Sequence, residues 1–265
     1  MNAWIVYEPD GAERNREYID MYKSEGLCRN ISFSLVMCDD IRSRKDNPDF
    51  AVVRAMRPDI TALLESRGVP VFNNLKVSEI CNDKSKTYAY LSTNNIPVIP
   101  WISAEAGESA PPAPFIPCVL KPCGGHGGSG VVLAKNEAEY ISLAGSMRSG
   151  YVIQRLAEDS SDTRVYVIGK KIVAAVMRRG RGDFRSNFSL GGDVCKRELT
   201  DEEKKLIYSV CELFEFGLVG IDIMYYNGHP VINEIEDTVG SRMLYATHKN
   251  IDIVSEYLDY IEKSL

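Results

Sequence analysis

Two short stretches of this 265-residue chain decide its interpretation: Gly220-Ile221-Asp222-Ile223 and Ile232-Asn233-Glu234-Ile235-Glu236. Successive side chains of a strand point to opposite faces, so Glu234 and Glu236 share one face and Ile235 takes the other. A turn centred on Gly228 places Asp222 opposite Glu234, because each lies six residues from that glycine. Gly220 then leaves space opposite Glu236. We therefore expect the three carboxylates to gather on one face of a β-hairpin.

Such a cluster has two interpretations. Neighbouring carboxylates repel one another, and each would have a raised pKa without a cation between them. Oxygen-only donors suit Mg²⁺ or another hard divalent cation such as Ca²⁺ or Mn²⁺ better than zinc, which predicts that Asp222, Glu234 and Glu236 are metal ligands. The alternative is a solvated outer face on which long side chains spread the charge. Asp222 fits that alternative least well, because it interrupts the apolar run 218–224.

A glycine-rich stretch, Lys121-Pro122-Cys123-Gly124-Gly125-His126-Gly127-Gly128-Ser129-Gly130, lies between two predicted strands. Glycines allow backbone N–H groups to approach phosphate oxygens, and Lys121 can add a point charge. Gly125, Gly128 and Gly130 are the candidate contacts, and a bare hairpin loop is the alternative. The stretch lacks the Gly-Lys-Ser/Thr ending of a Walker loop and opens no helix, which excludes both the P-loop and the Rossmann fingerprint.

The segment 177–187, Met-Arg-Arg-Gly-Arg-Gly-Asp-Phe-Arg-Ser-Asn, is basic in an otherwise acidic chain of formal net charge -6. Either it is a solvated loop or it is an anion clamp opposite the acidic hairpin, with Arg185 on phosphate and Asn187 adding an oxygen to the metal shell. Asp162 and Arg164, at the start of a preceding hairpin, are further candidates for a ribose contact and a cation. Asp162 alone also fits an ordinary turn.

The order of predicted elements indicates an α/β protein with α+β lobes. Strands and helices alternate up to residue 80, which favours a partly parallel sheet, and hairpins dominate after residue 157. We expect an N-terminal α/β lobe at 1–80, a small central lid lobe at 81–156 and a C-terminal lobe of antiparallel strands and helices at 157–265. Strands are predicted at 96–100 and 151–156, a helix at 13–25, and a proline-rich loop at 103–117 that could close as a lid with the glycine loop.

Composition limits the function classes. An acidic chain gives no general reason to expect nucleic-acid binding, and no apolar run reaches the roughly 20 residues of a membrane helix. The seven scattered cysteines favour free thiols in a cytoplasmic protein. Arg54 and Arg57 of the first lobe are candidates for anion contacts, with ordinary surface arginines as the alternative. Homo-oligomerisation is left open.

The candidate residues occur along the chain in one order: Lys84, Lys121 with its glycine loop, Asp-x-Arg at 162–164, Gly-Asp-Phe-Arg-Ser-Asn at 182–187, Asp222 and Glu-x-Glu at 234–236. This order resembles that of the ATP-grasp superfamily, most closely its RimK-like, ribosomal-protein glutamate ligase branch. The resemblance runs from about residue 73 to 240. It implies the ATP-grasp fold and ATP held between the second and third lobes.

The resemblance also implies roles for individual residues. Those on the nucleotide side are Lys84, Lys121, Gly125, Gly128, Gly130, Gln154, Arg155, Leu156, Asp162, Arg164, Arg185 and Asn187, with the backbone of 154–156 reading adenine. The implied magnesium ligands are Asp222, Glu234, Glu236 and Asn187. Arg185 and Arg178 would stabilise transferred charge, and Arg242 would hold a substrate carboxylate.

This chain departs from the family pattern at three places. Arg155 stands where close relatives usually carry an acidic residue, and Glu236 stands where asparagine is common. The stretch 237–242, Asp-Thr-Val-Gly-Ser-Arg, replaces a small, proline-containing turn that borders the acceptor pocket. The resemblance therefore does not transfer the identity of the substrate.

The implied activity is an ATP- and magnesium-dependent ligation of a carboxylate to an amine through an acyl phosphate. An amino acid, a small carboxylate or amine, or the end of a peptide or protein would fit as substrates. Two alternatives remain: a nucleotide-binding regulatory module without ligase activity, and a phosphotransferase that stops at the phosphorylated product. ADP formation stimulated by an amine or carboxylate separates the first from a ligase, and an amide product excludes the second.

Overall fold

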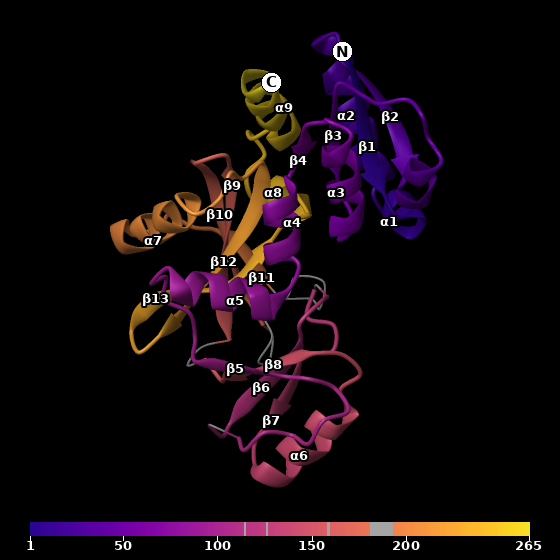
Figure 1. Cartoon of the computed structure of the whole chain (residues 1–265). Helices are drawn as coiled ribbons and strands as arrows, with labels where there is room; N and C mark the ends of the chain where they lie inside the picture. The colour runs from indigo at the N-terminus through magenta and orange to yellow at the C-terminus, as the bar shows by residue number, and fades with distance from the viewer. Residues whose placement is uncertain (114, 126, 158–159, 181–192) are drawn as a thin grey trace.

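The computed structural model describes residues 1–113, 115–125, 127–157, 160–180 and 193–265 of the chain, and it divides them among three sheets. Figure 1 shows the N-terminal lobe in indigo and purple, the central lobe in pink below, and the C-terminal lobe in orange and yellow between them. No helix in the described part of the chain combines the length and the apolar character needed to cross a bilayer.

The N-terminal sheet is parallel throughout, in the order β2-β1-β3-β4. Helices cover both of its faces, so its strands are mostly buried apolar residues. Its elements are β1 (Asn2–Tyr7), α1 (Pro9–Arg14), α2 (Arg16–Cys28), β2 (Ser32–Met37), the 3₁₀ helix η1 (Cys38–Arg42), β3 (Phe50–Val53), α3 (Pro58–Ser66) and β4 (Val71–Phe72). The helix predicted at 13–25 is in fact two helices, which meet at Asn15.

The central sheet is antiparallel, in the order β5-β8-β6-β7. Its elements are β5 (Trp101–Ala104), β6 (Cys118–Pro122), β7 (Val132–Ala134), α6 (Glu137–Ser146) and β8 (Tyr151–Arg155). The strand predicted at 96–100 was wrong: Pro97 and Pro100 cannot donate to a ladder, and only Val98 forms a single bridge, to Ile232.

The C-terminal sheet, in the order β11-β10-β9-β12-β13, carries the acidic hairpin. Its elements are β9 (Ser161–Ile168), β10 (Lys171–Arg179), β11 (Asp193–Lys196), α7 (Asp201–Cys211), β12 (Leu218–Tyr226), β13 (His229–Glu236), α8 (Arg242–Thr247) and α9 (Ile253–Ser264). Thr200 and Glu203 form the capping box expected at the start of α7. The sequence analysis missed β11 and α8.

Two connecting helices, α4 (Leu75–Cys81) and α5 (Lys84–Thr93), pack against the C-terminal sheet. Val77, Cys81 and Leu91 belong to the same buried cluster as Ile221 and Ile235. Lys84, at the first position of α5, is thereby fixed beside the acidic hairpin. The predicted lobe boundary at residue 81 stays a prediction. The contacts of α5 tie this helix to the C-terminal lobe, although the prediction assigned it to the central lobe.

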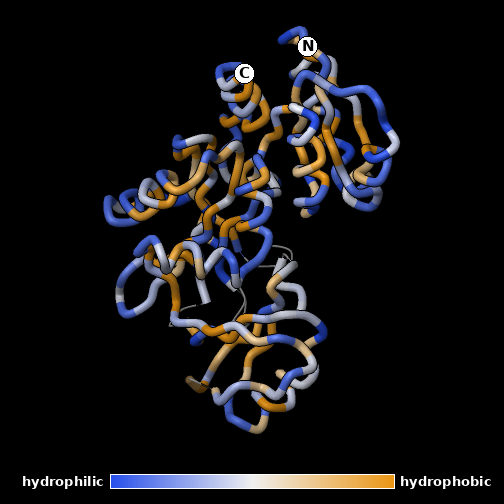
Figure 2. Tube along the Cα trace, in the orientation of Figure 1, coloured by the Kyte–Doolittle hydropathy of each residue, from blue (hydrophilic) through white to orange (hydrophobic). Residues whose placement is uncertain are grey.

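The cores show which lobes are coupled. One buried cluster joins the N-terminal and C-terminal lobes, and it includes Ile5 and Tyr22 on one side and Leu218, Tyr257 and Leu258 on the other. The central lobe has a separate core, whose buried members all lie between Cys118 and Ile153. Figure 2 shows apolar residues, in orange, along the strands of each sheet. Lobes that share a core move together, whereas a lobe with its own core can shift as a unit.

Candidate active site

The acidic hairpin gathers its carboxylates as the sequence predicts. Asp222 pairs with Glu234 and Gly220 with Glu236, and one oxygen of each of the three carboxylates lies within 4.8 Å of the others. The predicted turn centre was wrong, however. The loop is the two-residue turn Asn227-Gly228, both with positive φ, and a bulge between Asp222 and Ile223 on one strand and Glu234 and Ile232 on the other restores the pairing.

The bulge has a chemical consequence, because Asn233 is the extra residue. Its backbone carbonyl accepts a hydrogen bond from the Tyr88 hydroxyl at 2.7 Å, and its side-chain oxygen accepts one from Lys121 Nζ at 2.9 Å. A regular hairpin would have placed Asn233 opposite Asp222. The bulge therefore both aligns Glu234 with Asp222 and ties the hairpin to the central lobe.

Asp222 is buried and held by two arginines. Arg164 donates to both of its oxygens at 2.7 Å, and Arg178 donates to Oδ2 at 2.5 Å. Burial alone would raise the pKa of Asp222, but Arg164 and Arg178 outweigh it and lower the pKa. Asp222 is thus a carboxylate anion, and Oδ1 keeps acceptor capacity beyond its one hydrogen bond.

Glu236 and Glu234 are more accessible than Asp222, with 18% and 21% of their side chains exposed. Glu236 accepts from Arg164 at 2.6 Å, and burial together with Asp222 and Glu234 raises its pKa despite Arg164. Glu234 pairs with Lys84 at 2.9 Å. These two glutamates line a pocket, whereas Asp222 lies beneath them. The donor set, all oxygen and partly open, fits a hard divalent cation.

Lys84, at the start of α5, and Lys121, on β6 of the central lobe, both approach the acidic hairpin. Lys84 Nζ also donates to the carbonyl of Gly125 at 2.9 Å, which brings the glycine loop against Glu234. Lys121 Nζ donates to the side-chain oxygen of Gln154 at 2.6 Å. Burial lowers the pKa of Lys121 to about 8, with Glu234 opposing the shift and Lys84 adding to it.

The glycine loop uses backbone conformations that other residues avoid. Gly125, Gly128 and Gly130 have φ of 112°, 75° and 70°. At Gly130 an added Cβ would lie 2.9 Å from Pro122, so the hairpin closes only with glycine there. The predicted phosphate contacts of these glycines remain a prediction.

The linking strand ends where the resemblance places adenine. Gln154 is buried, and its backbone pairs with Trp101 and Val119. The Arg155 N–H donates to Pro100 at 3.0 Å, and the guanidinium lies 5.3 Å from the Phe115 ring centroid. The Leu156 N–H reaches Pro117 only at 3.5 Å, which leaves this amide the most available of the three.

Two residues assigned to the nucleotide have other partners. Asp162 is buried and accepts from Arg178 at 2.5 and 2.6 Å, so it orients Arg178, and the ribose contact implied by the resemblance stays a prediction. Arg164 uses Nε and both terminal nitrogens on Asp222 and Glu236. It supports the carboxylates, and the nucleotide contact predicted for it stays a prediction. The predicted Arg185 and Asn187 lie outside the described residues.

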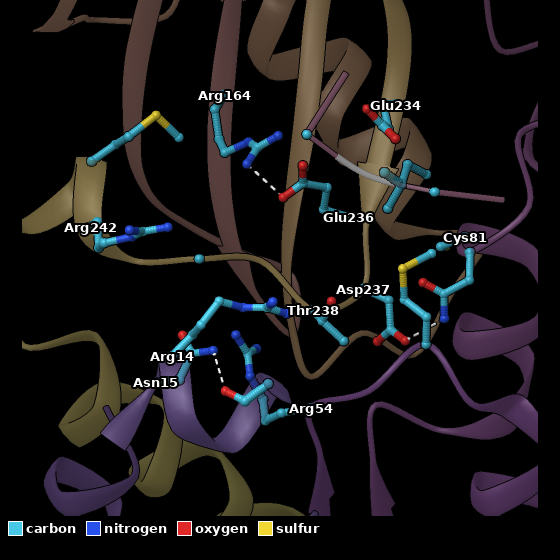
Figure 3. A pocket seen from close by; sticks show the side chains of 18 of the residues that line it. Arg14, Asn15, Arg54, Cys81, Arg164, Glu234, Glu236, Asp237, Thr238 and Arg242 are labelled. Carbon is cyan, nitrogen blue, oxygen red and sulfur yellow. Dashed lines mark hydrogen bonds and ion pairs between the residues drawn. The ribbon is translucent and has the colours of Figure 1, made fainter. Parts of the chain in front are cut away.

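A pocket of about 760 Å³ joins the acidic hairpin to the N-terminal lobe. Figure 3 shows Arg242, Arg14 and Arg54 pointing into it across from Arg164, Glu234 and Glu236. Arg178 also lines the pocket. The sequence analysis missed Arg14, which no motif marks. Arg57, its other anion candidate, is already paired with Glu8 and Asp59 at 2.7 and 2.8 Å.

Comparison with known proteins agrees with this geometry. The model of the RimK-like ATP-grasp domain matches residues 81–261. A probable alpha-L-glutamate ligase of Maridesulfovibrio salexigens is 33% identical over 56% of this chain and 51% of its own length. A probable alpha-L-glutamate ligase of Legionella pneumophila strain Corby is 27% identical over 76% of this chain and 69% of its own length. The chain thus spans about half of the first relative.

Solved structures of the same fold cover nearly the whole chain. The D-alanine–D-alanine ligase from Bacillus anthracis, complexed with ATP, has a TM-score of 0.77 at 20% identity and covers 99% of this chain and 96% of its own. A RimK domain ATP-grasp protein from Sphaerobacter thermophilus has a TM-score of 0.74 at 16% identity, over 98% and 99% of the two chains. At these identities the likeness establishes the fold and no more.

Proposed function

The chain belongs to the RimK-like ATP-grasp family of carboxylate–amine ligases, and we propose that it uses ATP and Mg²⁺ to join a carboxylate to an amine. The observation that carries the proposal is the convergence of Asp222, Glu234 and Glu236 within 4.8 Å, beside Lys84 and the glycine loop. Carboxylates that share a site with lysines can hold a cation and a polyphosphate together.

In this proposal Glu234, Glu236 and Asp222 would hold Mg²⁺ through their carboxylate oxygens. The bound Mg²⁺ would neutralise phosphate charge during transfer. Arg164 and Arg178 keep Asp222 anionic and fixed, so the ligand set is ordered before any cation arrives. Asn187, predicted as a further ligand, lies outside the described residues.

Nucleotide would lie between the central and C-terminal lobes. Lys84 and Lys121 would contact its phosphates, and the available Leu156 amide would serve adenine. The tie between Lys121 and Asn233 supports this placement, because it joins the central lobe to the acidic hairpin. The separate core of the central lobe would allow that lobe to close over bound nucleotide.

The reaction then needs only positioning and charge neutralisation. An oxygen of the substrate carboxylate attacks the γ-phosphorus, and the bond to the β-phosphate oxygen breaks to release ADP. The amine attacks the acyl carbon of the resulting acyl phosphate, phosphate leaves, and the amine loses a proton. Both reactants of the first step are anions, so arginines at the pocket lower its barrier. Arg178 lines the pocket and would act there, and Arg242, which also lines it, would hold a substrate carboxylate.

The relatives suggest where to look for substrates. Two of them are named probable alpha-L-glutamate ligases, and a neighbour of the same fold, PsnB, is described in complex with a precursor peptide. We therefore propose an amino acid as one substrate and a small carboxylate, peptide or protein terminus as the other. A phosphate-release screen with ATP, Mg²⁺ and a matrix of amino acids and short peptides would identify them.

Replacement of Glu234 by Gln tests the metal assignment. The variant keeps the size of the side chain but removes a ligand charge, and we expect ADP release to fall about 100-fold or more. Glu212→Gln is the matched control, since Glu212 is exposed and pairs only with Lys170 among described side chains. Undiminished ADP release by Glu234→Gln would end the metal assignment.

A further inference from the structure

The wall of the pocket that faces the acidic hairpin comes from the N-terminal lobe. It is formed by Tyr7 at the end of β1, by Gly11, Arg14 and Asn15 around α1, and by Arg54 and Met56 after β3. None of these residues is acidic, and two are arginines. They follow the carboxyl ends of adjacent parallel strands, which is where open α/β sheets bind ligands.

Arg54 is held in place without a carboxylate partner. One terminal nitrogen donates to the carbonyl of Val239 at 2.6 Å, and the guanidinium lies 5.3 Å from the centroid of the Tyr18 ring. Its Nε is buried and makes no hydrogen bond to any described residue. Arg54 is partly buried, and burial of part of a cation without a counter-ion is costly, which favours an anion within reach of it.

Tyr7 shows the same deficit beside Arg54. It is 3% exposed, and its hydroxyl forms no hydrogen bond of normal geometry within the described chain. Arg54 is near enough to offset part of the burial that raises the pKa of this phenol. The Tyr7 hydroxyl and Arg54 Nε thus lie on one wall of a pocket that is large enough for a small ligand, and neither has a hydrogen bond of normal geometry to a described residue other than the contact they make with each other.

Arg14 and Arg242 bring two more guanidiniums to the mouth of the pocket (Figure 3). Both are exposed, and neither makes an ion pair with a described carboxylate. Arg57 provides the contrast three residues after Arg54: it has Glu8 and Asp59 as partners and does not line the pocket. Arg164 and Arg178 also line the pocket but have carboxylate partners, so Arg14, Arg54 and Arg242 are the pocket arginines without a described carboxylate partner.

We propose that Arg14, Arg54 and the Tyr7 hydroxyl form an anion subsite for a substrate carboxylate other than the reacting one. This inference rests on the proposed ligase function, and it assigns to the N-terminal lobe the selection of an acidic amino acid or an acidic peptide end. Arg242 completes the subsite from the C-terminal lobe. The guanidinium fork suits this task, because it binds a carboxylate through two parallel hydrogen bonds.

The test is titration calorimetry of the full chain with L-glutamate, L-glutamine and the dipeptide Ala-Glu, with and without Mg²⁺ and a non-hydrolysable ATP analogue. We expect L-glutamate or Ala-Glu to bind at least tenfold more tightly than L-glutamine. The Arg14→Gln variant should lower that preference about tenfold, since a hydrogen bond between charged groups contributes about 1.5–3 kcal/mol. Preference for the dipeptide would place a peptide end in the subsite, and preference for glutamate a free amino acid.

Controls separate this subsite from general effects. Arg16→Gln removes the same charge two residues from Arg14, on an exposed position that does not line the pocket, and should leave the preference within twofold. Arg14 is exposed, so its variant is expected to fold, and Arg54→Gln is the second variant, checked by thermal unfolding. Equal weakening of glutamate and glutamine binding, or no preference in the unmodified chain, would overturn the subsite. Failure to bind the nucleotide analogue would instead count against the proposed ligase function, and the glutamate titration without nucleotide would still report on the subsite.

Discussion

The two walls of the pocket differ in whether their arginine side chains have carboxylate partners. On the C-terminal wall, Arg164 and Arg178 direct their nitrogens at Asp222, Glu236 and Asp162 at distances of 2.5–2.7 Å. On the N-terminal wall, Arg54 has a backbone carbonyl as its hydrogen-bond partner, and its Nε has none among the described residues. Both walls are ordered, but only Arg164 and Arg178, on the C-terminal wall, have carboxylate partners within the described chain.

This difference indicates that the arginines of the C-terminal wall support other side chains, whereas those of the N-terminal wall recognise a ligand. A paired arginine fixes a carboxylate so that it is ordered for a metal, and loss of either partner leaves an uncompensated buried charge. An unpaired arginine keeps its hydrogen bonds for a ligand. Substitutions on the first wall should therefore affect folding, and substitutions on the second should affect substrate affinity. The predictions below test that division.

The largest effect is expected for Arg164→Ala. Asp222 would keep only Arg178 in a site where its side chain is 1% exposed, and Glu236 would lose its only described ion pair. Breaking a buried pair in this way typically costs about 3–5 kcal/mol of unfolding free energy. Urea denaturation followed by circular dichroism measures the loss.

Arg242→Ala is the matched comparison on the open side of the pocket. Arg242 is exposed and lacks an ion pair in the described chain, so the unfolding free energy should change by less than about 0.5 kcal/mol. The affinity for an acidic amino acid should fall instead. Similar losses of stability in the two variants would refute the division between the walls.

Gly220→Ala should give a middle-sized effect, because this glycine lies where the two walls meet. An added Cβ would be 2.6 Å from Val239 Cγ2 and 3.2 Å from Arg164 Cδ. Val239 is buried and its carbonyl holds Arg54. Overpacking of this kind costs about 1–3 kcal/mol. Denaturation measures that cost, and displacement of Val239 should also weaken binding of acidic substrate more than binding of nucleotide.

The control for this prediction is Gly145→Ala, on α6 of the central lobe, where an added Cβ would meet no atom within 4 Å. It should be neutral or slightly stabilising. If Gly220→Ala were equally neutral, the close approach of Val239 and Arg164 to Gly220 would not constrain the pocket.

Sequence patterns sufficed to predict the carboxylates of the C-terminal wall. Alternation in 232–236 placed Glu234 and Glu236 on one face, and the pairing of Asp222 with Glu234 was right. The reason given for that pairing was wrong, because the turn lies between Asn227 and Gly228 and a bulge supplies the extra residue. The misplaced turn centre and the unforeseen bulge each shift the strand register by one residue, and the two shifts cancel. A bulge is decided by tertiary contacts, here those of Asn233 with Tyr88 and Lys121, which no local pattern reveals.

The pocket arginines that lack a carboxylate partner were predicted only in part: Arg54 and Arg242 were candidates for an anion and a substrate carboxylate, whereas no motif marks Arg14. Arg14, Arg54 and Arg242 belong to three separate elements, and only the fold brings them to one pocket. In sequence Arg54 and Arg57 look equivalent, and the deciding difference is that Asp59 and Glu8 lie beside Arg57 alone. The assignment of Asp162 to ribose stays a prediction, and its pairing with Arg178 on the neighbouring strand is a contact that no local pattern indicates.

The last prediction concerns pH and Lys121, the cation that links the central lobe to the C-terminal wall of the pocket. Burial lowers its pKa from 10.5 to about 8, so its folded-state pKa lies below its unfolded value. Such a group stabilises the fold above pH 10.5 and loses that contribution as the pH falls through 8.

Nucleotide binding should follow the opposite course, because phosphate needs the protonated amine. With a pKa near 8, about 90% of the lysine is charged at pH 7 and about 10% at pH 9, which predicts a roughly tenfold weaker affinity for the ATP analogue at the higher pH. Lys121→Arg keeps its charge throughout this range and should flatten the profile, measured by titration with the analogue at fixed Mg²⁺. A flat profile in the unmodified chain would show that Lys121 does not contact the nucleotide, and it would leave Lys121 as a purely structural tie to Asn233.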